Sequence, residues 1–271
     1  MNLKIISEIG KNWIVSEKQD DYLGVAKKLI IESKNAGADL VKIQVHVLED
    51  EKKKRYPSRY EWIKRNEEIT TERFLQDIFS YAKELSIEIF GTPMSFLAAK
   101  KLNPFVKRWK VGSADITDFE LLTYLKETKK PVIISTGMST EEQIDKAVEF
   151  LGDQIEFILH CVSEYPTLDE GINLNTIQFL KEKYPQLKVG FSDHTLSTDI
   201  PIYAVFCGAE LVEKHFTLDR SAFGPDHKVS LLPNEFREMV DKINKLPIIL
   251  GKKEKILTEK EKEFWSKFRL K

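Results

Sequence analysis

Two histidines, His194 and His215, follow short apolar runs and are separated by a helix-length segment. The runs, 187–191 and 209–216, have the composition of β-strands, and residues 198–207 between them are apolar enough for a crossover helix. In such a unit the strands are parallel neighbours, so their carboxyl ends face the same way. Two neutral imidazoles that converge near a carboxylate form a transition-metal site with positions open to substrate. The spacing therefore predicts a metal site at His194 and His215.

A second group of residues has the chemistry of an anion site. Lys42 and Lys110 supply cations at two other apolar runs, and nearby hydroxyls suit phosphate and carboxylate oxygens: Ser113, Ser135 and Ser192. Glu8, at the end of the first apolar run, is predicted to serve acid–base chemistry at the metal end. Lys42 or Lys110 could instead act as a Schiff-base nucleophile, which keeps an aldolase open as an alternative.

The elements that must position these residues form eight alternating pairs. Short β-type runs lie at 3–8, 40–46, 87–91, 109–112, 132–135, 157–160, 187–191 and 210–216. Amphipathic segments lie between and after them at 21–35, 71–85, 95–102, 118–128, 140–151, 174–184, 198–207 and 233–245. Eight such units predict an α/β fold, a closed (β/α)8 TIM barrel, whose active site lies at the carboxyl ends of the strands.

The composition excludes several classes of protein. The 271 residues suit one barrel, so residues 1–271 are predicted to form a single domain, with a short closing helix in the tail 249–271. Balanced charges, net −1, give no reason to expect nucleic acid or membrane as a partner. Cys161 and Cys207 are predicted to be reduced core residues, which fits a cytoplasmic location.

Three further features bear on the site or on its surroundings. The charged insertion 47–65 follows the second strand, so it is either a lid over the carboxyl face or a solvated loop. His160 precedes Cys161 inside an apolar run and is predicted to be a hydrogen-bonded core histidine. Lys214 alternates with Glu213 and His215 along its strand, which predicts that it faces the other side of the sheet.

These residues occur in motifs that resemble the sialic acid synthase (N-acetylneuraminate synthase) family, which includes the legionaminate and pseudaminate synthases. The motifs run in order from about residue 5 to about residue 235: EIG at Glu8, AGADLVKIQ through Lys42, KVGSADI from Lys110, ISTGM at Ser135, HCVSEYPT from His160, GFSDHT at His194, EKHFTLD at His215 and GPDH at Asp226. The resemblance implies a barrel that condenses phosphoenolpyruvate with the open-chain aldehyde of an N-acylated hexosamine, commonly N-acetylmannosamine. Water is consumed, phosphate leaves, and a nine-carbon 2-keto acid forms.

The same resemblance implies a role for each matching residue. His194 and His215 would hold a divalent metal, usually Mn²⁺, with Mg²⁺ or Co²⁺ as alternatives. Glu8 and Asp226 would act in catalysis. Phosphoenolpyruvate and the amino-sugar aldehyde would bind to the remaining residues: Lys42, Lys110, Ser113, Asp115, Ser135, Ser163, Tyr165 and Ser192.

The sequence departs from the family pattern at its end and at three positions. The family's C-terminal antifreeze-like domain, which supplies an arginine to the partner's sugar site, has no counterpart before Lys271. We therefore expect a homodimer, a separate accessory chain, or arginines of the insertion (Arg55, Arg59 or Arg65) to complete the site. The family's asparagine–histidine pair is Asn12-Trp13, its asparagine after HC-x is Ser163, and its glutamate after GSG is Asp115. A non-catalytic phosphosugar-binding barrel is the third alternative.

Overall fold

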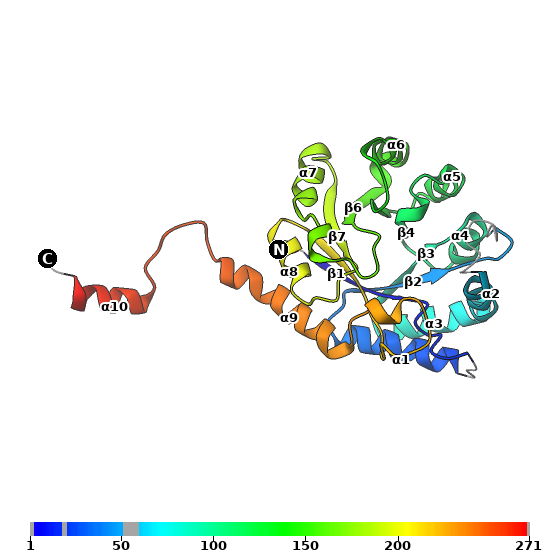
Figure 1. Ribbon diagram of the computed structural model, residues 1–271, viewed down its shortest axis with the longest axis horizontal. Helices are drawn as coiled ribbons and strands as arrows, with labels where there is room; N and C mark the ends of the chain where they lie inside the picture. The colour runs from blue at the N-terminus through cyan, green and yellow to red at the C-terminus, as the bar shows by residue number, and fades with distance from the viewer. Residues whose placement is uncertain (1–2, 18–20, 51–59, 270–271) are drawn as a thin grey trace.

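Eight parallel strands close into a barrel in sequence order, and the first strand pairs with the last (Figure 1). The computed structural model describes residues 3–17, 21–50 and 60–269. The strands are β1 Lys4–Gly10, β2 Leu40–Val45, β3 Glu88–Pro93, β4 Trp109–Val111, β5 Val132–Ser135, β6 Ile155–Cys161, β7 Lys188–Asp193 and β8 Leu211–His215. The closed (β/α)8 barrel predicted from the sequence is confirmed.

Helices surround the barrel and connect its strands (Figure 1). They are α1 Tyr22–Asn35, α2 Tyr60–Ile69, α3 Glu72–Glu84, α4 Phe96–Leu102, α5 Phe119–Glu127, α6 Glu141–Leu151, α7 Asn175–Lys183, α8 Ile200–Phe206, α9 Pro233–Leu250 and α10 Glu259–Phe268. Side chains cap several of the helices: Thr71, Ser95 and Asp118 each accept a hydrogen bond from a backbone N–H of the first turn. Thr140 and Gln143 form a reciprocal capping box at the start of α6.

The predicted helices between the strands are all present, within a few residues of the expected bounds. The insertion 47–65 differs, because its last residues begin the helix α2. Residues 51–59 of the insertion lie outside the described residues, so its role as a lid stays a prediction.

Successive side chains along a strand point to opposite faces, so polar cavity residues alternate with apolar core residues. Glu8 and Lys42 line a cavity in the barrel, whereas their strand neighbours Ile9 and Val41 are fully buried in the hydrophobic core. Ser7, also beside Glu8, forms a buried hydrogen bond with Ser33 of α1, at 2.7 Å between hydroxyl oxygens. One side of each strand therefore holds the helices in place, and the other carries the polar residues that sequence analysis selected.

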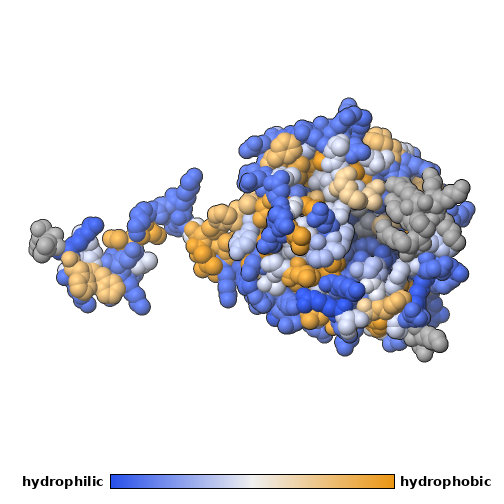
Figure 2. Space-filling view, in the orientation of Figure 1, coloured by the Kyte–Doolittle hydropathy of each residue, from blue (hydrophilic) through white to orange (hydrophobic). Residues whose placement is uncertain are grey.

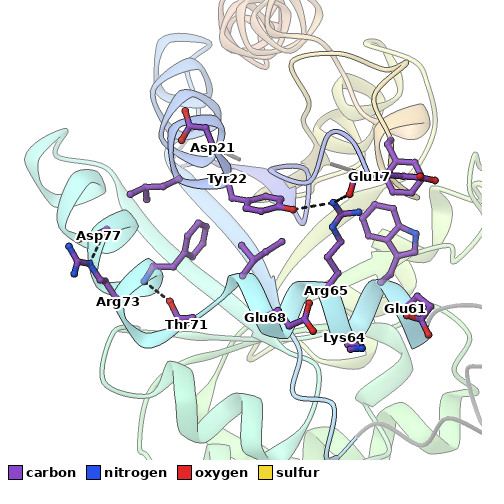
Figure 3. A pocket seen from close by; sticks show the side chains of 15 residues that line it. Glu17, Asp21, Tyr22, Glu61, Lys64, Arg65, Glu68, Thr71, Arg73 and Asp77 are labelled. Carbon is purple, nitrogen blue, oxygen red and sulfur yellow. Dashed lines mark hydrogen bonds and ion pairs between the residues drawn. The ribbon is translucent and has the colours of Figure 1, made fainter. Parts of the chain in front are cut away.

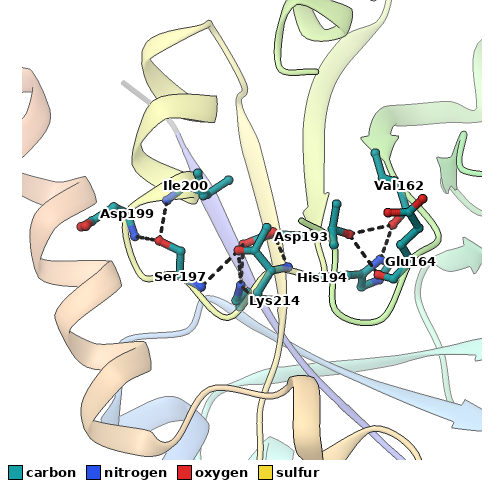
Figure 4. A network of polar contacts seen from close by, with 10 residues as sticks. Val162, Glu164, Asp193, His194, Ser197, Asp199, Ile200 and Lys214 are labelled. Atoms are coloured by element: carbon teal, nitrogen blue, oxygen red, sulfur yellow. Dashed lines mark hydrogen bonds and ion pairs between the residues drawn. The ribbon is translucent and has the colours of Figure 1, made fainter. Parts of the chain in front are cut away.

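Lys214 on β8 follows the same rule and forms a buried ion pair away from the cavity. Its Nζ lies 2.5 Å from Asp193 Oδ2 and donates to the Thr195 carbonyl at 2.6 Å. Figure 4 shows Lys214 meeting Asp193 between the ends of β7 and β8. Both side chains of the pair are fully buried, so the charges must compensate one another. The prediction that Lys214 faces away from the site is confirmed.

The tail forms a helix, α10, but it does not close the barrel. Residues 251–269 are all exposed, and Figures 1 and 2 show them projecting from the barrel with apolar side chains on their surface. Phe264, Trp265 and Phe268 are among those apolar residues. The helix predicted in the tail is present as α10, but in the described part of the tail it is exposed and does not close the barrel. Within the described ranges, no helix is long and apolar enough to span a membrane.

The Lys214–Asp193 pair generates a prediction about stability. Replacing Lys214 with methionine leaves the Asp193 carboxylate buried without its charge partner, so we expect the free energy of unfolding to fall by about 3–5 kcal/mol. Urea denaturation followed by circular dichroism measures this. The control is Lys188→Met, an exposed lysine at the start of β7, which should change stability by less than about 0.5 kcal/mol. A loss below about 1 kcal/mol for Lys214→Met would contradict the account of this pair.

Candidate active site

The twelve residues selected from the sequence line one cavity of about 600 Å³, to which the ends of the strands contribute. They are Glu8, Lys42, Lys110, Ser113, Asp115, Ser135, Ser163, Tyr165, Ser192, His194, His215 and Asp226. The carboxyl ends of barrel strands and the loops that follow them are where active sites of this fold form. The structure therefore brings together every predicted site residue.

A compact group of buried charges occupies the centre of the cavity. Lys42 Nζ lies 2.6 Å from Glu8 Oε2 and 3.5 Å from Glu213 Oε1, and it donates to Thr92 Oγ1 at 3.0 Å. Ser192 Oγ also donates to Glu213 Oε1, at 3.2 Å. The second carboxylate oxygen of Glu213, Oε2, is buried and receives no hydrogen bond from the part of the chain that the structure describes. The centre thus holds two carboxylate partners for Lys42 and keeps one carboxylate oxygen available.

The surroundings push the pKa values of the two central carboxyls apart. Burial raises the pKa of Glu8, against the lowering effect of Lys42. Burial would also raise the pKa of Glu213, but Lys110 and Lys42 outweigh it and lower that pKa. Glu8 is therefore suited to exchange a proton, whereas Glu213 stays ionised beside the lysines.

The pKa values of the two lysines are also shifted in opposite directions. Burial would lower the pKa of Lys42, but the carboxylates of Glu213 and Glu8 outweigh it and raise the pKa. Burial lowers the pKa of Lys110, against the opposing effect of Glu213. Lys42 is accordingly a fixed cation, and Lys110 is the more easily deprotonated amine of the two.

Hydroxyl groups surround Lys110 on one side of the cavity. Lys110 Nζ donates to Ser135 Oγ at 2.6 Å, and the backbone N–H of Gly137 donates to Ser113 Oγ at 3.1 Å. A Cβ atom at Gly137 would lie 2.4 Å from Ser163 Oγ and 2.8 Å from Ser113 Oγ, so only glycine fits beneath these serines. An ammonium group, small hydroxyls and a close backbone together make a site for an anion.

Two imidazoles and a phenol form the other side. The ring centroids of His194 and His215 are 5.4 Å apart, and the Tyr165 ring lies 4.2 Å from the His194 ring. His194 Nδ1 donates to the Val162 carbonyl at 2.7 Å, an arrangement visible in Figure 4. Because a carbonyl can only accept, Nδ1 carries a proton, and in the neutral form of the ring the lone pair is on Nε2. Burial would lower the pKa of His194, but Cys161 and the Val162 carbonyl outweigh it and raise that pKa. Burial lowers the pKa of His215 to about 3, so this ring is neutral at physiological pH.

The imidazole pair fits a metal ion that keeps positions open. Imidazoles bound to one ion at about 2.1 Å per nitrogen have ring centres about 5–6 Å apart, which matches His194 and His215. His215 Nδ1 is buried and has no hydrogen-bond partner among the described residues, and the Val162 bond orients His194 as ligating histidines are usually oriented. Among residues 3–17, 21–50 and 60–269, no three His, Cys, Asp or Glu side chains group closely enough to hold a metal by themselves. Any ion here would need water or substrate as further ligands.

Sequence reasoning assigned no role to several residues that the cavity includes. Lys11 Nζ donates to Gln44 Oε1 at 3.0 Å and lies 3.9 Å from Asp226 Oδ2, while Gln44 Nε2 donates to Glu8 Oε1 at 2.8 Å. Gln44 lies two positions after Lys42 on β2, and Glu213 lies two positions before His215 on β8. Residues two apart share a strand face, so strand periodicity could have identified both. Lys11 follows the regular part of β1, where no periodic pattern predicts its direction.

His160 and the two cysteines are all predicted to lie in the core, and the structure places them differently. His160 is buried and its Nε2 donates to the Ile172 carbonyl at 2.6 Å, which confirms a core histidine. Both cysteines are free thiols, but Cys207 is only half-buried and Cys161 lines the cavity. Cys161 Sγ lies 4.0 Å from His194 Nδ1. The prediction is confirmed for Cys161, a buried free thiol that also lines the site, and is wrong for Cys207, which is not buried in the core.

A larger hollow of about 850 Å³ lies outside this site, between the loop after β1 and the helices α2 and α3. Figure 3 shows the local contacts of two arginines that line it: Arg65 reaches Tyr22 OH, at 3.1 Å, and the Glu17 carbonyl, and Arg73 approaches Asp77. Arg65 therefore lies in this hollow and does not complete the sugar site in the way we expected. Arg55 and Arg59 are outside the described residues.

Comparison with known proteins gives consistent matches along the chain. Residues 29–255 match the NeuB family. The chain is 39% identical over 263 residues to an uncharacterised protein of Methanocaldococcus jannaschii, with 96% of this chain and 75% of that protein covered. It is 33% identical over 282 residues to the N,N'-diacetyllegionaminic acid synthase of Legionella pneumophila, with 96% and 77% covered.

A solved structure agrees with these sequence matches. The N-acetylneuraminic acid (sialic acid) synthetase of Leptospira borgpetersenii superposes with a TM-score of 0.84 at 29% identity, covering 99% of this chain and 93% of that one. The family match spans most of the barrel, including the strands that carry Lys42, Lys110 and His215. The chain belongs to the NeuB family, the family of the sialic, legionaminic and pseudaminic acid synthases.

Proposed function

We propose that this chain condenses phosphoenolpyruvate with the open-chain aldehyde of an N-acylated hexosamine, such as N-acetylmannosamine or a related sugar. The products are a nine-carbon 2-keto acid and inorganic phosphate, and a divalent metal, Mn²⁺ by preference, assists the reaction. The observation that carries the proposal is the division of one cavity into an anion-binding side and an imidazole side, with buried carboxyls between them. Membership of the NeuB family supports the same reaction class.

Phosphoenolpyruvate carries a phosphate and a carboxylate, so it needs two cationic or hydroxyl-rich positions. Lys110 with Ser113 and Ser135 suits one of these anions, and Lys42 with Ser192 suits the other. Both lysines are buried, where an ammonium group binds an anion more strongly than it would in water. In the proposed complex the enol carbon of phosphoenolpyruvate points toward the imidazole side.

His194 and His215 would hold the metal. A divalent ion there would polarise the sugar aldehyde and help to orient water. Tyr165 stacks on His194 and is half-exposed at the cavity surface, which places an aromatic surface beside the incoming sugar. Asp115 and Ser163 line the same cavity and would contact sugar hydroxyls or the N-acyl group.

The reaction requires two proton movements, which the carboxyls can perform. A C–C bond forms between the enol carbon and the aldehyde carbon, so the aldehyde oxygen must gain a proton. Water adds to the adjacent carbon and loses a proton before the C–O bond to phosphate breaks. We assign these steps to Glu8, whose pKa is raised by burial, and to Asp226. The carboxylates of both residues lie beside Gly10 in the cavity.

The relatives' names limit the acceptor to a class. They include synthases of three different products: N,N'-diacetyllegionaminic acid, pseudaminic acid and N-acetylneuraminate 9-phosphate. The acceptor proposed for this chain is accordingly the class of N-acylated amino-sugar aldehydes.

A Schiff-base aldolase is the second candidate, and one observation favours it. Burial lowers the pKa of Lys110, which brings that amine closer to the neutral, nucleophilic form. A covalent lysine adduct and the absence of any need for a metal would distinguish this mechanism from the synthase.

The first test is phosphate release from phosphoenolpyruvate across a panel of N-acylated and plain aldoses, with Mn²⁺ present or removed by a chelator. We expect release that requires both an N-acylated acceptor and the metal. Borohydride is added in a parallel reaction with pyruvate and each sugar. Chelator-resistant turnover with trapping of a lysine would support the aldolase and contradict the synthase. A protein that binds no phosphoenolpyruvate would contradict the synthase.

The second test concerns the metal ligands. His215→Ala removes an imidazole that lines the cavity, so we expect turnover to fall at least about 100-fold and Mn²⁺ binding to weaken, without loss of fold. His160→Gln is the matched control, because its imidazole serves the Ile172 carbonyl and does not line the cavity. Calorimetric titration with Mn²⁺ measures binding. Parent-like Mn²⁺ affinity in His215→Ala would refute the assignment of this ligand.

A further inference from the structure

Lys11 is a buried cation in the cavity wall for which the proposed reaction has so far provided no role. Its side chain is 5% exposed, and its Nζ contacts Gln44 and approaches Asp226. A buried ammonium group costs free energy unless it is paired and hydrogen-bonded, so its position here calls for a physical explanation. Lys11 belongs neither to the central lysine group, formed by Lys42 and Lys110, nor to the outward-facing pair of Lys214.

The backbone just before Lys11 explains how the side chain reaches the cavity. Pairing of β1 with β2 is irregular between Glu8 and Gly10, and Gly10 has a φ of +51°. This left-handed conformation favours glycine. A Cβ atom at Gly10 would lie 3.1 Å from Glu8 Oε1, 3.3 Å from Asp226 Oδ2 and 3.4 Å from Gln44 Nε2. Three polar side chains therefore converge on one small space, and the irregularity that clears it also directs Lys11 toward them.

Lys11 and Glu8 together determine which way the amide of Gln44 faces. An ammonium group can only donate hydrogen bonds, so the amide oxygen must face Lys11, at 3.0 Å. The amide nitrogen then faces Glu8 and donates to its Oε1 at 2.8 Å. The reversed amide would place its N–H groups against the ammonium and its oxygen against the carboxylate, which is unfavourable on both sides. Lys11 thus helps to hold Gln44 in the orientation that donates to Glu8, although Lys11 itself takes no part in that hydrogen bond.

We propose that Lys11 is a positioning residue for the synthase reaction: it orients Glu8 through Gln44 and attracts Asp226 on the opposite side. The inference rests on the proposed function, because Glu8 and Asp226 are the groups assigned to proton transfer. Lys11 acts at that end of the cavity, whereas phosphoenolpyruvate is assigned to Lys42 and Lys110. Loss of Lys11 should therefore slow the chemical step and leave phosphoenolpyruvate affinity nearly unchanged.

Lys11→Met tests this inference, since methionine keeps a similar length and cannot donate. We expect kcat to fall about 10- to 100-fold, as for other residues that orient reacting groups, while the Kd for phosphoenolpyruvate changes less than about twofold. Steady-state kinetics and calorimetry on the full chain measure the two quantities. Lys130→Met is the matched control, because Lys130 Nζ likewise donates to a side-chain amide oxygen, that of Asn103, at 2.6 Å, outside the cavity. The control should retain the parent kcat.

A double replacement tests the route through Gln44. If Lys11 acts partly by orienting Gln44, the double variant Lys11→Met/Gln44→Met should lose much less activity than the product of the two single losses. Independent structural damage would instead multiply the two losses. Should Lys11→Met fail to fold, Lys11→Gln takes its place, because it keeps polar atoms and removes only the charge.

The outcomes separate this inference from the proposed function. No turnover by the parent chain with any acceptor would refute the proposed function and this inference with it. An active parent with unchanged kcat in Lys11→Met would refute the inference alone. Equal losses of kcat and phosphoenolpyruvate affinity, or losses that multiply in the double variant, would also overturn it.

Discussion

The structure depends on the compensation of charges buried at the mouth of the barrel. Glu8, Lys42, Lys110 and Glu213 are all buried, and a single uncompensated charge among them would cost several kcal/mol. Ion pairs and hydrogen bonds among these residues offset the free-energy cost of burying the charges. Within the described residues, Glu213 Oε2 still has no hydrogen bond, so one acceptor remains for a ligand. The barrel thus keeps polar groups ready for a charged substrate at a place where a hydrophobic core would otherwise form.

The barrel tolerates this concentration of charge because its strands have two faces. Outward side chains, such as Ile9 and Val41, pack against helices and supply the hydrophobic stabilisation. Where a charge faces outward, as Lys214 does, a partner of opposite charge lies beside it. Stability therefore rests mainly on the outer layer, and the inner residues near the strand ends are available for chemistry. This separation explains why one fold can carry so polar a site.

Periodicity and residue type predicted much of this arrangement. Period-two strands that alternate with amphipathic helices require parallel neighbours, and parallel neighbours bring His194 and His215 together from distant positions. The carboxyl-end rule then placed Lys42 and Ser135 in the same cavity. These inferences succeed because they depend on repeating geometry and not on the details of any loop.

The features that sequence reasoning missed depend on irregular backbone or on contacts between distant side chains. Lys11 enters the cavity through a strand irregularity at Gly10, which no periodic pattern encodes. Cys161 lies in an apolar run, which is typical of a core residue, and only the three-dimensional structure shows that it also lines the cavity. The capping box and apolar side chains of α10 predict a helix, and the helix is present. They do not specify whether that helix packs against the barrel, and the structure shows that it is exposed.

The most direct measurement of the central claim is a crystal structure of the chain with Mn²⁺ and phosphoenolpyruvate, with anomalous data collected to locate the metal. The account predicts an anomalous peak bound by both His194 and His215, and phosphoenolpyruvate held by Lys42, Lys110 and the neighbouring serines. A metal bound elsewhere, or phosphoenolpyruvate outside the cavity that these residues line, would contradict it.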